Sequence, residues 1–154
     1  MLKVGDKIPN IDVIDQNGKT INLSRLTHQK LIIYFYPKDS TPGCTAEACN
    51  FRDNQHILED RGFKIFGVSA DSINSHQKFI DKHGLPFTLL ADEDKSLIKA
   101  FGVWGLKKFM GKEYEGILRT TFITDENGTI THVITKVKTK DSTQQILDLL
   151  DEKE

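Results

Sequence analysis

Residues 31–44 read LIIYFYPKDSTPGC, and this stretch carries most of the information about the fold. Its first six residues are aliphatic or aromatic, and Pro37 ends the run. A short run of β-branched and aromatic residues predicts a strand that is buried on both faces, as in a parallel sheet. The loop that follows contains Pro42 and Gly43 and leads into Cys44. We therefore expect a central strand, then a loop, then a helix that begins close to Cys44.

Turn and cap signals divide the rest of the chain into strands and helices. Residues 10–23 predict a hairpin around Asn17-Gly18, a strong two-residue turn signal. The remaining predicted elements are a helix over 45–61 capped by Gly62, a strand over 63–70, a helix capped by Asp71 or Ser72 that ends near His83, a strand over 87–91, a helix over 96–101, a hairpin over 121–137 around Asn127-Gly128, and a helix that starts at a capping box of Ser142 and Gln145. This order predicts an α/β fold with a mixed central sheet flanked by helices and an N-terminal β-hairpin extension.

Length and charge set broad limits on function. The chain has 154 residues, and we expect one domain over 1–154. It has 21 basic and 22 acidic residues and a net charge of −1, so no overall field attracts nucleic acid or anionic lipid. No apolar run approaches the ~20 residues that a membrane span requires, and the N-terminal residues lack a secretory apolar segment. We therefore expect a cytoplasmic protein without nucleic-acid or membrane partners.

Cys44 is the first candidate for chemistry. The predicted strand, loop and helix place its sulfur at a helix N-terminus, where unpaired N–H groups and the helix dipole stabilise an anion. The thiolate form is the nucleophile in cysteine chemistry. A lone cysteine usually packs as a small hydrophobic residue. Here the loop, the helix position and the nearby Cys49 favour a reactive site instead.

Cys49 lies five residues after Cys44. In a helix this spacing separates the two Cα atoms by ~8.6 Å and by about 140° around the axis. A disulfide requires Cα atoms within about 7 Å of each other. The two cysteines can therefore bond only if the helix locally unwinds. The spacing also differs from the C-x-x-C redox motif, and two cysteines leave a zinc site incomplete.

Other patterns carry less information. His76 and His83 are seven residues apart on one predicted helix, but two histidines do not complete a metal site. The segment 105–112 contains two glycines and three lysines but departs from the phosphate-binding loop pattern, so we interpret it as a basic, solvated loop. Spacing alone leaves a Cys–His protease pair open. We expect no cofactor and no metal.

The segment 36–49, read as YPKDSTPGCTAEAC, resembles the active-site segment of the peroxiredoxins. Pro37, Thr41 and Cys44 match the family pattern Pro-x-x-x-Thr-x-x-Cys, and Cys49 matches the resolving cysteine of the peroxiredoxin Q group, also called bacterioferritin comigratory proteins. Residues 101–105 and 116–122 also resemble that group, and the likeness runs from about residue 3 to residue 150. The resemblance implies a thioredoxin-like fold with an N-terminal extension.

The resemblance also implies a catalytic cycle. Cys44 attacks a hydrogen peroxide or organic hydroperoxide molecule and becomes a sulfenic acid. Cys49 then closes an intramolecular Cys44–Cys49 disulfide, which thioredoxin or a similar dithiol protein reduces. Such a protein is an antioxidant enzyme of cell redox homeostasis. An intrachain resolving cysteine removes the chemical need for a dimer, and we expect a monomer.

Four further site residues follow from the same resemblance. Thr41 contacts the thiolate and the peroxide through its hydroxyl, and Arg119 supplies positive charge to both. Pro42 screens the site, and its missing N–H removes a competing donor. Pro37 shapes the loop.

Two other functions remain possible from the sequence. A thioredoxin-like disulfide reductase or isomerase would share the fold, but it would favour C-x-x-C spacing, whereas four residues separate Cys44 from Cys49. A peroxide sensor or holdase chaperone would use the same oxidation of Cys44 without turnover. The sequence does not distinguish a sensor from an enzyme, because the first chemical step is shared.

Overall fold

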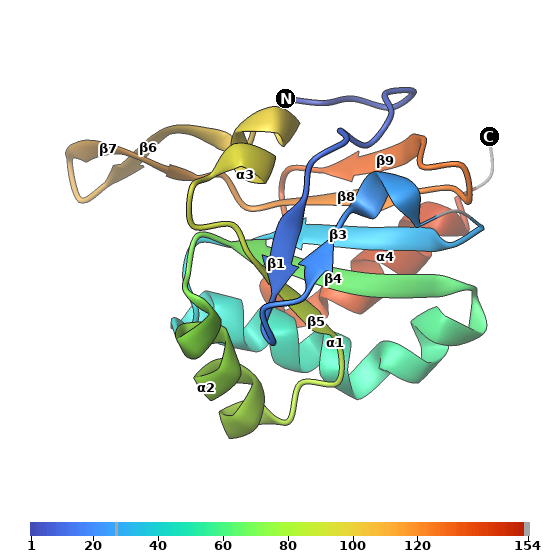
Figure 1. The fold of residues 1–154 in the computed structure, drawn as a ribbon, viewed down its shortest axis with the longest axis horizontal. Helices are drawn as coiled ribbons and strands as arrows, with labels where there is room; N and C mark the ends of the chain where they lie inside the picture. Colours follow the sequence, from blue (N-terminus) through green and yellow to red (C-terminus); the bar gives the residue numbers. More distant parts are fainter. Residues whose placement is uncertain (27, 153–154) are drawn as a thin grey trace.

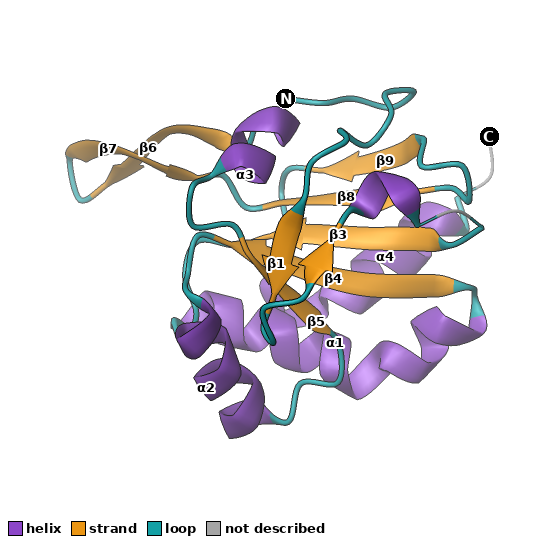
Figure 2. Cartoon of the chain, viewed as in Figure 1, coloured by secondary structure: helices purple, strands orange, loops and turns teal. Residues whose placement is uncertain are grey.

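The computed structural model describes residues 1–26 and 28–152. Its centre is a seven-stranded sheet with the strand order β2-β1-β5-β4-β3-β8-β9 (Figures 1 and 2). β3 runs parallel to β4 and β4 parallel to β5, whereas the other neighbouring strands are antiparallel. The strands are β1 (Val13–Asp15), β2 (Thr20–Ile21), β3 (Lys30–Phe35), β4 (Phe63–Ser69), β5 (Thr88–Ala91), β8 (Thr120–Thr124) and β9 (Ile130–Ile134). The predicted mixed sheet and N-terminal hairpin are confirmed.

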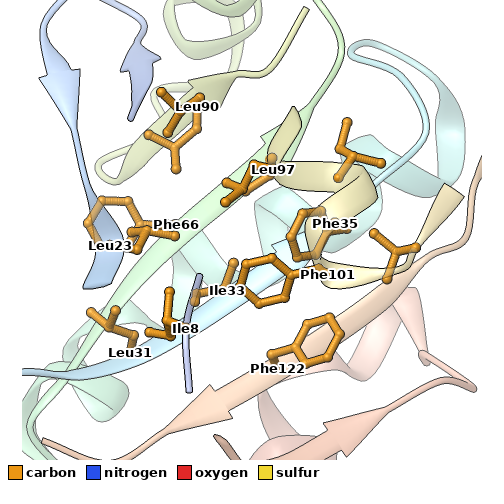
Figure 3. Packing of buried hydrophobic residues seen from close by; sticks show 14 of the residues in the cluster. Ile8, Leu23, Leu31, Ile33, Phe35, Phe66, Leu90, Leu97, Phe101 and Phe122 are labelled. Atoms are coloured by element: carbon orange, nitrogen blue, oxygen red, sulfur yellow. The ribbon is translucent and has the colours of Figure 1, made fainter. Parts of the chain in front are cut away.

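Helices cover both faces of this sheet. The helices α1 (Pro42–Asp60), α2 (Ile73–His83) and α4 (Ser142–Leu150) pack on one face, and α3 (Ser96–Phe101) with the 3₁₀ helix η1 (Leu23–Arg25) packs on the other. Alternate residues of β3 point to the two faces. Ile33 and Phe35 join Phe101 of α3 (Figure 3), while Tyr34 packs in the cluster that contains Cys44. The prediction that this strand is buried on both faces is therefore confirmed.

Helix α1 begins three residues earlier than predicted. Its first residue is Pro42, which suits this position because the first N–H of a helix has no intrahelical partner. The helix continues without a break to Asp60, and Gly62 follows it with φ 86°. Cys44 and Cys49 therefore lie in one continuous helix, with Cys44 in the first turn.

The prediction that residues 105–112 form a basic loop is wrong. The residues form a hairpin of β6 (Trp104–Phe109) and β7 (Lys112–Ile117), which make a separate two-stranded sheet and project from the body of the molecule (Figure 1). In these two strands only Ile117, at the base of the hairpin, is buried, so the sequence lacks the apolar alternation that predicts a strand. Met110 and Gly111 at the turn both have positive φ, but methionine is not a turn signal.

The predicted capping box at the start of α4 is also wrong. Ser142 is the first residue of α4, and the Gln145 side chain accepts a hydrogen bond from the N–H of Lys138 outside the helix. The N–H of Thr143 instead donates to Oδ1 of Asn50 in α1 at 2.9 Å. A tertiary contact therefore replaces the local cap. Among the described residues, no helix is both long and apolar enough to cross a membrane.

Candidate active site

The Cys44 side chain lies in the first turn of α1 and is only 1% exposed. The N–H groups in the first turn of a helix have no intrahelical acceptor, so their partial positive charges favour an anionic sulfur. The sulfur packs in the apolar cluster between α1 and the sheet. Cys44 therefore lies at a helix N-terminus, as the sequence predicts, and it is also shielded from water, which the sequence did not predict.

Arg119 provides the nearest full positive charge. It lies just before β8, whose Thr120 pairs with Phe35 of β3, so the register of these strands brings it to the start of α1. Its Nη2 donates to the Cys44 Sγ at 3.3 Å. Burial lowers the pKa of Arg119, but the charges of Cys44 and Glu47 outweigh that effect, and the net shift is upward. The guanidinium thus stays charged beside the sulfur.

Gly43 leaves room for this contact. A Cβ atom at Gly43 would lie 3.2 Å from Nη2 of Arg119, closer than Cβ atoms normally come to other groups. A side chain at this position would therefore crowd the guanidinium that contacts Cys44.

Glu47 is a member of the site that the sequence analysis missed. Its side chain is fully buried, and its Oε1 accepts from Nη1 of Arg119 at 2.8 Å. Burial raises the pKa of Glu47 to about 7, against a partial lowering by Arg119. Its Oε2 has no hydrogen-bond partner among the described protein groups. The spacing from Cys44 is a usable signal, because residues three apart share one helix face.

Thr41 is the N-cap residue of α1, but its side chain makes no capping hydrogen bond. Its hydroxyl donates to the carbonyl oxygen of Lys38 at 2.8 Å. The single hydroxyl proton is used in this bond, so Oγ1 can only accept from another group. Pro42 is exposed at the first position of the helix, and Pro37 is half-buried two residues after the end of β3. These positions put all three residues around the segment that leads to Cys44.

Cys49 is half-buried, and both cysteines are free thiols. Because α1 is continuous, helix geometry keeps their Cα atoms ~8.6 Å apart, too far for a disulfide. The structure therefore brings together Cys44, Arg119 and Glu47 but holds Cys49 away from them.

Comparisons with known sequences agree with one another. The model of the AhpC/TSA family matches residues 4–133. Peroxiredoxin Bcp of Bacillus subtilis is 45% identical over 149 residues, which cover 97% of this chain and 95% of that protein. Peroxiredoxin Bcp of Escherichia coli K12 is 44% identical over 151 residues, which cover 98% of this chain and 97% of that protein.

Solved structures show the same likeness. The bacterioferritin comigratory protein of Xanthomonas campestris, studied for its alkyl peroxide reduction activity, matches with a TM-score of 0.87 and 35% identity over 96% of this chain and 97% of that chain. A cysteine-to-serine variant of PrxQ from Xylella fastidiosa matches with a TM-score of 0.90 and 32% identity over 97% and 96%. These matches confirm the thioredoxin-like fold implied by the active-site segment.

Proposed function

This chain belongs to the AhpC/TSA family and is a peroxiredoxin of the Bcp/PrxQ type, and we propose that Cys44 reduces peroxides in a cycle that Cys49 completes. The observation that carries the proposal is the 3.3 Å contact between the Arg119 guanidinium and the Cys44 sulfur at the N-terminus of a helix. The proposed substrates are hydrogen peroxide and organic hydroperoxides.

In the first step the Cys44 thiolate attacks the terminal oxygen of the peroxide. The O–O bond breaks, the sulfur becomes a sulfenic acid, and the leaving oxygen takes up a proton and departs as water or an alcohol. Negative charge moves from the sulfur to the leaving oxygen during this step. Arg119 already contacts the sulfur and can stabilise both charges without reorganisation.

Thr41 orients the peroxide in this scheme. Because its hydroxyl proton points to the Lys38 carbonyl, Oγ1 offers a lone pair to the O–H of an incoming peroxide. Every hydroperoxide has such an O–H at its terminal oxygen. Accepting from it would turn that oxygen toward the sulfur, whatever group is attached at the other end.

Thiolate formation alone cannot account for catalysis. An ordinary cysteine is about 3% ionised at pH 7, so full ionisation increases the rate by at most ~30-fold. Enzymes typically lower barriers by at least ~8 kcal/mol, and ~30-fold corresponds to about 2 kcal/mol. The remainder must come from holding the peroxide in line and from stabilising charge in the transition state. Thr41 and Arg119 are the groups proposed for these two tasks.

In the second step the Cys49 thiolate attacks the Cys44 sulfenic acid. A sulfur–sulfur bond forms, and the hydroxyl group leaves with a proton as water. The first turns of α1 must unwind for this step, because the helix keeps the two cysteines apart. We propose that a thioredoxin-type dithiol then reduces the disulfide and is itself oxidised.

The test is NADPH consumption in the presence of thioredoxin, thioredoxin reductase and a peroxide. We expect turnover with the wild-type protein and none with Cys44→Ser, since serine is nearly isosteric but does not ionise near pH 7. Turnover also separates an enzyme from a sensor, which would stop after one equivalent of peroxide. A reductase or isomerase would reduce a disulfide substrate without peroxide.

The proposal also includes the oligomeric state, the location and the partners of the enzyme. We propose that the protein is a monomer, because both cysteines of the cycle belong to one chain. We also propose that it is cytoplasmic, has one domain over 1–154 and uses no cofactor or metal. Its partners would be the peroxide and the dithiol protein alone. Sedimentation velocity of the reduced and oxidised protein tests the monomer, which a dimer in either state would contradict.

A further inference from the structure

Asp39, in the loop between β3 and α1, is the centre of a buried hydrogen-bond network outside the peroxide chemistry described above. Its Oδ1 accepts from the Tyr36 hydroxyl at 2.6 Å, and its Oδ2 accepts from the Ser75 hydroxyl at 2.9 Å. The ring of His76 contacts the same Oδ2 through Nδ1 at 2.7 Å. These donors come from the end of β3 and from α2, so one carboxylate ties the loop to two elements.

The network extends to two further strands. Nε2 of His76 lies 3.0 Å from the carbonyl oxygen of Leu90 in β5. The backbone N–H of Asp39 donates to Oδ2 of Asp71, which also accepts from the Ser69 hydroxyl at the end of β4. The side chains of Asp39 and His76 are 2% and 0% exposed, so water does not compete for these bonds. The loop is therefore fixed at its midpoint.

Donors and acceptors are matched around His76 and Asp39. A carbonyl oxygen only accepts, so Nε2 of His76 carries a proton toward Leu90. Nδ1 of His76 lies 2.7 Å from Oδ2 of Asp39, within hydrogen-bond distance. Burial and the neighbouring charges raise the pKa of Tyr36 well above its usual value, so its hydroxyl remains a donor to Asp39. Every polar atom of the Asp39 carboxylate is thus satisfied by a donor.

The segment directly after Asp39 is the part that must be accurately placed. Ser40 has φ 64°, a left-handed conformation that residues other than glycine adopt at a cost. The next residue, Thr41, directs its hydroxyl proton to Lys38 on the other side of Asp39. Such strained backbone persists only where its surroundings over-determine it. The carboxylate of Asp39 is the fixed point on one side of Ser40, and α1 is the fixed point on the other.

We propose that Asp39, held by Tyr36, Ser75 and His76, is a positioning residue that orients the peroxide-binding loop and so sets the rate of Cys44 oxidation. The inference rests on the proposed peroxidase function. The network acts on the acceptor atom of Thr41 and the approach of the peroxide. It does not touch the sulfur, whose anion depends on Arg119 and the helix N-terminus.

Asp39, Asp71 and His76 also present ligand atoms within 4.8 Å of one another, which is a possible arrangement for a cation. Each of these atoms already holds a hydrogen bond from the protein: Oδ2 of Asp39, Oδ2 of Asp71 and Nδ1 of His76. The geometry is that of a filled hydrogen-bond network, and a positioning role accounts for it without a metal.

Tyr36 and Tyr34 offer a matched pair of variants. Both are fully buried on the same face of the molecule, and their rings stack with centroids 5.4 Å apart. The Tyr36 hydroxyl binds Asp39, whereas the Tyr34 hydroxyl has no partner among the described residues. Tyr36→Phe therefore removes one support of the loop, and Tyr34→Phe removes a hydroxyl of equal size that supports nothing.

The experiment measures two rates for Cys44 in each reduced variant: oxidation by hydrogen peroxide in a stopped-flow instrument, and alkylation by iodoacetamide. Alkylation reports the thiolate without requiring an oriented peroxide. We expect Tyr36→Phe to slow oxidation ~10-fold and Asp39→Asn ~100-fold, because an error of about 1 Å in placement costs up to ~10²-fold. Alkylation should stay within about twofold of wild type in both, and Tyr34→Phe should leave both rates unchanged.

Two results would overturn the inference. Oxidation at the wild-type rate in Tyr36→Phe and Asp39→Asn would show that the loop does not depend on the network. A parallel fall of oxidation and alkylation would show a general loss of the site. If Asp39→Asn fails to fold, Tyr36→Phe and Ser75→Ala decide the question by the same ratio. Absence of peroxide reduction in the wild type would refute the proposed function instead, which keeps the two failures distinct.

Discussion

Arg119 contacts two groups at once, the Cys44 sulfur at 3.3 Å and the Glu47 carboxylate at 2.8 Å. The carboxylate holds the flat guanidinium in place, so that its other nitrogen faces the sulfur. An arginine suits this task better than a lysine, because its planar fork can bind two groups in fixed directions. At the scale of single residues, one guanidinium therefore bridges the reactive sulfur and a buried carboxyl group.

Removal of that cation should slow the first chemical step. We expect Arg119→Ala to reduce the rate of Cys44 oxidation by ~10²–10³-fold, by analogy with the loss of one charge-stabilising donor. The oxidation rate of Arg119→Lys should lie between those of the wild type and Arg119→Ala, because lysine keeps the charge but cannot bridge both partners. Stopped-flow oxidation by hydrogen peroxide measures the effect. A wild-type rate in Arg119→Ala would refute the electrostatic account.

Glu47 should make stability depend on pH. Its pKa is raised from 4.5 to about 7 in the folded protein, so folding favours the protonated form. This contribution to the free energy of unfolding is fully present below pH 4.5. As the pH rises through 7 it is lost, which lowers the free energy of unfolding by about 3 kcal/mol. Glu47→Gln is uncharged at every pH and lacks this pH-dependent contribution to stability. Urea unfolding of both reduced proteins at pH 4.5 and pH 8 tests it, and a wild type that loses no more stability than Glu47→Gln would contradict the prediction.

At the scale of elements, α1 has two different parts. Its first turns carry the reactive cysteine, and Cys49 must leave the helix if the disulfide is to form. From Asn50 onward the helix is tied to the C-terminal helix α4. The Asn50 side chain accepts from Thr143 at 2.9 Å and donates to the Lys140 carbonyl at 2.8 Å. These contacts begin one residue after Cys49.

Oxidation should therefore unwind the start of α1. We expect the backbone amides of residues 43–52 to exchange faster in the oxidised protein than in the reduced protein, with the loss of protection ending near Asn50, where α4 holds the helix. Hydrogen exchange with mass spectrometry measures this, and Cys49→Ser without peroxide is the control. Equal protection in both states, with the disulfide confirmed by mass, would mean that the bond forms without unwinding.

At the scale of the whole molecule, the site lies at one end of the central strands of the sheet. The segments after β3 and β4 carry Asp39 and Asp71, and the antiparallel β8 begins at the same end, directly after Arg119. Loops beyond the carboxyl ends of parallel strands commonly form sites in α/β folds. The arrangement leaves the chemistry to one chain, with both cysteines on α1.

The complete cycle should separate into two halves when the second cysteine is removed. We expect Cys49→Ser to consume one equivalent of peroxide and then to lose most thioredoxin-dependent turnover, because no disulfide can form within the chain. Excess peroxide should drive Cys44 to the sulfinic acid. Peroxide consumption and intact mass are the measurements, with Cys44→Ser as the control that consumes none. Full turnover in Cys49→Ser would show that Cys49 does not resolve the sulfenic acid.

The sequence by itself determined the elements whose signals are local. The buried strand before Pro37, the two Asn-Gly hairpins and the helix ended by Gly62 follow from periodicity and turn chemistry over a few residues, and the structure confirms them. The reactive position of Cys44 at a helix N-terminus was predictable for the same reason. Arg119 entered only through the family resemblance, since nothing near it in the sequence points to Cys44.

The tertiary structure alone decided which distant groups meet. The contact of Arg119 with Cys44 depends on the register of β8 against β3, and that of His76 with Asp39 depends on the packing of α2. The same is true of Asn50, which caps α4 from another helix, and of the β6–β7 hairpin, whose strands are largely exposed on both faces. Local patterns report which residues avoid water. They carry no record of which partner, 37 to 93 residues away, satisfies a buried charge or an unpaired N–H.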